Sequence, residues 1–154
     1  MKKITNLLMM LAVVLFAACE DPIETPEPTL EVKPFNIEGT WKLATLNDHQ
    51  LAEGTYVYLV LDRKYTYEIY DNLSSMYPVL TTGSYALEYD WRVGDVISGT
   101  YDYQLGAWAH EYIITDLYPE SMTWTAKDAA EVQKFVRVDE VPSHIVEAVR
   151  KSVK

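Results

Sequence analysis

The feature that most constrains this chain is a series of short runs rich in Tyr, Trp, Thr, Val and Ile, which continues from Ile37 to Val138. Gly, Asp, Asn or Pro separates the runs, a pattern typical of strands joined by tight turns. Eight strands are expected, at roughly 38–46, 55–61, 64–71, 83–90, 95–104, 110–117, 121–126 and 131–138. The pattern predicts an all-β fold, a small eight-stranded antiparallel meander barrel, although an open sandwich of the same meander would also fit.

The run 55–61 differs from the others because it is apolar on both faces. A strand of this kind must be covered outside the barrel as well as inside. The segment 141–154 is one candidate for the cover, since its apolar residues recur at helical spacing and Pro142 and Ser143 suit a helix start. We therefore expect a short C-terminal α-helix over 141–154, docked on the outside of the sheet.

The N-terminus has the pattern of an export signal. Lys2 and Lys3 precede an apolar stretch that is too short to span a bilayer, and small residues stand directly before Cys19. This arrangement resembles a bacterial lipobox, which implies a signal peptide over 1–18 and acyl chains on Cys19. Two or three acyl chains would hold the mature protein on a membrane without a transmembrane helix.

Residues 20–36 separate Cys19 from the expected barrel. They contain four of the seven prolines and five acidic residues against one Lys. Proline favours extended backbone and like charges repel each other, so 19–36 is expected to be an acidic tether. The chain then divides into the signal peptide, this tether, a barrel over 37–140 and the helix over 141–154.

Charge and cysteine content exclude several classes of protein. Thirteen basic residues against 23 acidic ones give a net charge of −10, which argues against nucleic acid as a partner. The single cysteine excludes an internal disulfide and a cysteine-based zinc cluster.

Two motifs at the ends of the expected barrel suggest a family. The first strand contains Gly39-Thr40-Trp41, and the last contains Phe135-Val136-Arg137. Together with the lipobox and the acidic tether, they resemble the lipocalin-like lipoproteins of Bacteroidota, over roughly residues 38–138. The resemblance implies an outer-membrane lipoprotein in which Trp41, after Gly39, lies at the closed end of the barrel with Arg137 over its ring.

Aromatic residues are the candidates for a binding site. The residues expected to point inward are Tyr65, Tyr67, Tyr85, Leu87, Tyr89, Tyr101 and Tyr103. They could line a pocket for a small apolar or aromatic ligand, or simply fill a barrel of this size. Trp108 lies between two alanines in a predicted hairpin tip, which favours an exposed surface that contacts a ligand or another protein.

Catalytic and metal-binding patterns are absent from the sequence. His49, His110 and His144 have no partner at metal-ligand spacing, and no Ser lies in a Gly-x-Ser-x-Gly motif. We therefore expect a non-catalytic lipoprotein without a cofactor or metal, anchored to the membrane and binding a small apolar ligand. The alternative is a filled barrel that binds an envelope protein through loops such as 106–110 and 71–78.

Overall fold

The computed structural model describes residues 27–103 and 106–152. Cys19 and the expected signal peptide lie outside these residues. The described residues contain two helices, α1 (Pro34–Ile37) and α2 (Ser143–Ser152). The strands are β1 (Gly39–Leu46), β2 (His49–Gln50), β3 (Val57–Asp62), β4 (Thr66–Asp71), β5 (Val79–Asp90), β6 (Gly94–Tyr101), β7 (Tyr112–Thr115), β8 (Ser121–Ala126) and β9 (Val132–Val138).

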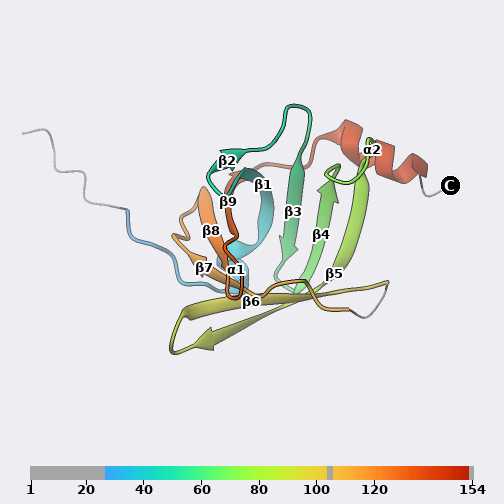
Figure 1. Cartoon of the computed structure of the whole chain (residues 1–154). Coiled ribbons are helices and arrows are strands. Elements are labelled where there is room, and N and C mark those ends of the chain that lie inside the picture. Colours follow the sequence, from blue (N-terminus) through green and yellow to red (C-terminus); the bar gives the residue numbers. More distant parts are fainter. Residues whose placement is uncertain (1–26, 104–105, 153–154) are drawn as a thin grey trace, which may run out of the picture.

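The strands close into a barrel (Figure 1). Each long strand pairs antiparallel with the next, and β1 pairs with β3 on one side and β9 on the other. In this seam Trp41 lies opposite both Leu59 and Arg137. The expected eight-stranded meander barrel is confirmed and the open sandwich is excluded, while the two-residue β2 is an additional strand paired with the end of β1.

The strand bounds differ from expectation mainly around β5. This strand begins at Val79, four residues before the expected start, and β6 ends at Tyr101 rather than residue 104. β5 pairs with β4 as far as Ser84, and β7 pairs with β6 only at Val96 and Ile97. Residues 89–95 therefore pair only with each other and form the free end of a hairpin (Figure 1).

The strand β3 separates two apolar clusters. Leu59 and Leu61 are buried inside the barrel, whereas Tyr58 is buried on the outside. The outer cluster joins Tyr58 and Tyr70 to three residues of the C-terminal segment, Val141, Ile145 and Val149. The expected helix and its docking against the doubly apolar strand are confirmed for residues 143–152.

The segment before β1 is packed on the barrel. The backbone N–H of Leu30 donates to the carbonyl of Leu117 at 2.7 Å, and Leu30 and Val32 pack against the inner core. Ile37, at the end of α1, is completely buried. Residues 30–36, expected to belong to the tether, therefore contact the barrel, because Leu30 and Val32 pack against its core from half-buried positions.

Candidate functional site

One end of the barrel is closed by Arg137 and Trp41. The guanidinium carbon of Arg137 lies 4.1 Å from the centroid of the Trp41 ring, which is within cation–π range. Arg137 also donates to three backbone carbonyls, from Nε to Pro119 (2.5 Å), from Nη1 to Glu38 (2.6 Å) and from Nη2 to Asn36 (2.9 Å). The side chain therefore joins β9 to the α1 segment and to the turn before β8.

Gly39 and Trp41, on the neighbouring strand β1, lie next to the Arg137 guanidinium. Gly39 has φ +133°, and a Cβ at this position would overlap the guanidinium. The indole N–H of Trp41 donates to the carbonyl of Ile37 at 2.8 Å. Burial lowers the pKa of Arg137. The ordinary pKa of an arginine is so high that the guanidinium nevertheless remains charged. Gly39, Trp41 and Arg137 thus form a structural closure.

Four of the seven residues expected to face inward belong to the inner core. Tyr67 and Tyr85 are buried, and Leu87 and Tyr101 pack against them from half-buried positions. Both buried hydroxyls have backbone acceptors, the carbonyl of Thr100 for Tyr67 (3.1 Å) and that of Asp62 for Tyr85 (2.8 Å).

The other three lie outside, so their expected inward orientation is wrong. Tyr65, Tyr89 and Tyr103 are 47%, 75% and 87% exposed. Tyr65 has φ +66° in the turn before β4, which breaks the alternation. Tyr89 lies on the free end of the β5–β6 hairpin, and Tyr103 follows the end of β6.

Trp108 is inserted into the barrel, contrary to the expected exposed position. Its ring centroid lies 5.1 Å from that of Tyr67, 5.9 Å from Trp124 and 6.4 Å from Tyr112. The expectation failed because the turn after β6 folds back, with the backbone N–H of Trp108 donating to the carbonyl of Gly99 at 2.8 Å.

Gly99 makes room for the indole of Trp108. A Cβ at this position would overlap the indole ring. Gly99 lies between Ile97 and Tyr101 on the inward-facing positions of β6, so a glycine here leaves a gap beside large neighbours. This gap was the sequence signal that could have predicted an inserted side chain.

Further aromatic contacts continue from Trp108 across the interior. Trp124 lies 5.6 Å from Tyr112 and 5.1 Å from Phe135, measured between ring centroids. The Tyr112 hydroxyl donates to the carboxylate of Glu131 at 2.8 Å, and burial raises the pKa of Tyr112. The Trp124 indole N–H is buried without a hydrogen-bond partner, so one polar group of the inner core is unsatisfied.

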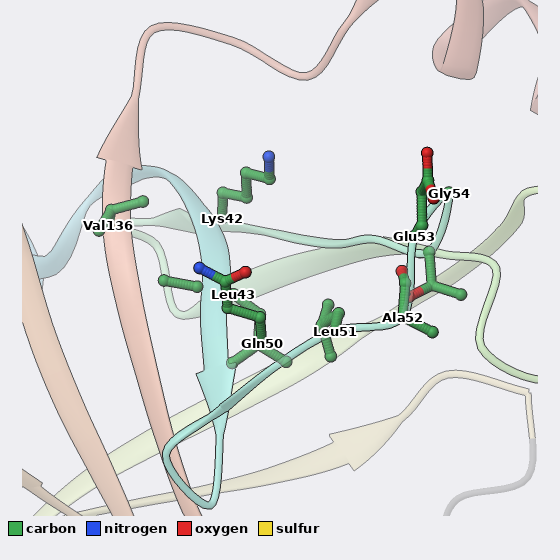
Figure 2. A pocket seen from close by; sticks show the side chains of 10 residues that line it. Lys42, Leu43, Gln50, Leu51, Ala52, Glu53, Gly54 and Val136 are labelled. Atoms are coloured by element: carbon green, nitrogen blue, oxygen red, sulfur yellow. The ribbon is translucent and has the colours of Figure 1, made fainter.

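The outer wall carries a hollow that the sequence did not indicate (Figure 2). The β1–β3 ladder ends at Lys42 and Tyr58, and the chain between β2 and β3 bends outward beyond this point. The resulting open hollow has a volume of about 390 Å³. It is lined by Lys42, Leu43, Ala44, Gln50, Leu51, Ala52, Glu53, Gly54, Thr55 and Val136.

The hollow combines apolar side chains with one cation and one carboxylate. In Figure 2 the side chains of Lys42 and Glu53 stand on opposite sides of it, with Leu51 between them. Both charged side chains belong to exposed residues, which weakens their field through water and salt. Residues 51–55 form a loop without strong periodicity, so the sequence had no pattern from which to predict this hollow.

The histidines lie apart. His110 Nδ1 lies 2.7 Å from Asp128 Oδ1, while His49 in β2 and His144 in α2 are exposed. Within residues 27–103 and 106–152, no group of three or more His, Cys, Asp or Glu side chains is arranged to hold a metal ion. In the same part of the chain, neither helix has the length and apolar character needed to cross a membrane.

Comparison with known proteins adds no relative: no family model, curated protein or solved structure matches this chain.

Proposed function

We propose that this chain is a non-catalytic, lipid-anchored lipoprotein of the bacterial outer membrane, whose barrel is a rigid scaffold that binds another envelope protein. The lipobox around Cys19 supports the anchor, and its acyl chains are the membrane partner. The closed barrel supports the scaffold role, since its strand ladder and buried aromatic residues hold the loops in fixed positions.

The single observation that carries the scaffold role is the insertion of Trp108 into the barrel. Its indole lies against Tyr67 and Trp124, where a ligand of a hollow barrel would be held. Arg137 and Trp41 close the other end. Recognition is therefore assigned to the outer surface, where the loop 72–78 exposes Leu73, Met76 and Tyr77.

The anchor is tested by the mass of the mature chain and by radiolabelled palmitate. The wild-type chain expressed in a bacterium should end at Cys19, carry acyl chains and fractionate with the outer membrane. The Cys19→Ser variant should incorporate no label and leave the membrane fraction. An unlabelled wild-type chain that still begins at residue 1 would contradict the anchor.

The partner surface is tested by a photo-crosslinking residue at position 77 in intact cells. The same crosslinker at position 68, on the outer barrel wall, is the matched control. A crosslinked band should form from position 77 alone and disappear in a Leu73→Ser/Met76→Ser background. If both positions give the same bands, the loop 72–78 has no specific partner.

A second candidate function, binding of a small apolar or aromatic ligand inside the barrel, is favoured by the unpartnered indole N–H of Trp124. A buried donor without an acceptor costs about 1–3 kcal/mol, and a ligand with an acceptor atom would recover this. Such a ligand must displace Trp108. Native mass spectrometry of the protein purified from its cells should then show a bound small molecule, and a bare chain mass would contradict this candidate.

A further inference from the structure

The free end of the β5–β6 hairpin exposes a small group of apolar residues. Tyr89, Trp91 and Val93 are all exposed, and Trp91 is 82% accessible to solvent. We call these three residues the hairpin tip. The strand ladder explains the exposure, because residues 89–95 pair only with each other and no neighbouring strand covers them.

The turn that carries the hairpin tip is held by its own hydrogen bonds. The Asp90 carboxylate accepts from Nε and Nη2 of Arg92, both at 3.1 Å, and from the Arg92 backbone N–H at 3.0 Å. The backbone N–H of Val93 donates to the Asp90 carbonyl at 3.1 Å. These bonds fix the turn with Trp91 exposed to solvent. Binding through Trp91 therefore does not have to order a flexible loop, which would cost entropy.

The distance from the expected anchor to the barrel is short. Leu30 is bonded to Leu117, so only residues 20–29 separate Cys19 from a fixed point on the barrel. A fully extended chain of this length reaches at most about 40 Å. The barrel is therefore held close to the membrane that contains the acyl chains.

The hairpin tip lies on the side of the barrel from which the chain leads toward Cys19. In Figure 1 the β5–β6 hairpin and the described chain start at Glu27 both extend to the left. Helix α2 and the β4–β5 loop that contains Tyr77 lie on the opposite side. A membrane reached through the N-terminal segment would thus meet the hairpin tip before the loop with Tyr77.

We propose that the hairpin tip inserts Tyr89, Trp91 and Val93 into the lipid–water interface of the bilayer that anchors Cys19. This proposal rests on the anchor of the proposed function and adds a second membrane contact. Trp and Tyr rings are enriched at the headgroup level, where one edge is apolar and the other is hydrated. Because the anchor keeps the tip near the surface, even a weak insertion is populated.

The charges around the tip determine which lipids it prefers. Glu88, Asp90, Asp95 and Glu111 carry four negative charges against the two positive charges of Arg92 and of Lys127, whose Nζ lies 3.9 Å from the Asp90 carboxylate and 2.8 Å from that of Glu111. Anionic headgroups would repel this excess, so zwitterionic headgroups are favoured.

The test is quenching of tryptophan fluorescence by bromine on lipid acyl chains. The full acylated chain is reconstituted into phosphatidylcholine vesicles with and without bromolipid. Trp41 and Trp124 are buried and Trp108 is half-buried against the barrel core, whereas Trp91 is 82% exposed, so Trp91 is the indole that bromine should reach. We expect quenching of the wild type, and its loss in Trp91→Phe. Replacing part of the phosphatidylcholine by phosphatidylglycerol should weaken the quenching.

A matched control moves the exposed indole to the other side of the molecule. The Trp91→Phe/Tyr77→Trp variant keeps four tryptophans and places one in an equally exposed loop, and it should not be quenched. Quenching of this variant equal to that of the wild type would overturn the proposal. Absence of quenching in the wild type would also overturn it, and would leave the hairpin tip as a contact for a protein partner. The mass of the chain distinguishes failure of this proposal from failure of the anchor. An acylated chain without quenching refutes only the membrane contact of the hairpin tip. An unacylated chain refutes the anchor and, with it, this membrane contact.

Discussion

The indole N–H of Trp108 donates to the hydroxyl of Tyr67 at 2.9 Å, and that hydroxyl donates in turn to the carbonyl of Thr100 at 3.1 Å. The bond joins the turn after β6 to the inner face of β4. Two large aromatic side chains thereby satisfy their polar atoms inside the barrel, as buried polar groups require. Trp108 thus packs against the inner core from a half-buried position.

Removing the Trp108 ring should destabilise the barrel. Trp108→Ala leaves a gap beside Tyr67 and Trp124 and should lower the free energy of unfolding by about 2–4 kcal/mol. Urea unfolding followed by circular dichroism measures the change. Trp91→Ala, at an exposed position, is the control and should change stability by less than about 0.5 kcal/mol. Similar losses in both variants would contradict the inserted position of Trp108.

Arg137 should not be replaceable by lysine. Arg137→Lys keeps the charge but cannot reach the carbonyls of Pro119, Glu38 and Asn36 with one planar group. We expect a loss of about 2–4 kcal/mol in the free energy of unfolding. Arg63→Lys is the control, because Arg63 pairs with Glu38 on the exposed surface and should cost less than about 1 kcal/mol. A smaller loss at position 137 than at position 63 would refute the closure.

The outer cluster under α2 should contribute to stability independently of the barrel interior. Ile145 is buried against Tyr58 and Tyr70, so Ile145→Ala should cost about 2–4 kcal/mol in thermal or urea unfolding. The exposed Glu147 on the same helix provides the control, since Glu147→Ala should have little effect. If Ile145→Ala unfolds like the wild type, α2 does not cover β3 in solution.

Stability should fall at alkaline pH. Burial, with Glu68 as acceptor, raises the pKa of Tyr70 to about 12, and burial raises the pKa of Tyr85 to about 12. In the unfolded chain both pKa values are near 10. The folded state therefore binds these protons more tightly, and their contribution is complete below about pH 10 and lost toward about pH 12.

This pH dependence can be measured from urea midpoints between about pH 8 and about pH 12. Tyr85→Phe should flatten the decline in part, and Tyr85→Phe/Tyr70→Phe should flatten it further. An unchanged slope in the double variant would show that neither hydroxyl is responsible.

The barrel was predictable because its signals are local. Each strand has alternating residues between turn residues, and β3 carries its own evidence of a second covered face in Tyr58 and Leu59. The pairing of Trp41 with Arg137 was accessible only through the family resemblance, since the two residues lie at opposite ends of the barrel domain.

The errors concern residues whose position depends on distant contacts. Trp108 was expected in solvent because its neighbours are small, yet its position is set by the backbone of Gly99 and the ring of Tyr67. Tyr89 follows the expected alternation along β5, but β7, the strand that should cover it, pairs with β6 only at Val96 and Ile97 and does not reach it. The bond between Leu30 and Leu117, which attaches part of the expected tether to the barrel, likewise joins residues far apart in sequence.

The pairing of Trp41 with Arg137 also determines the order in which this domain can assemble. Neither edge of the sheet is covered until β9 has been synthesised, and contacts of such long sequence separation slow folding. Until then the chain carries two open strand edges, which can pair with other chains. A chaperone that shields those edges would be needed most just before the final strand docks.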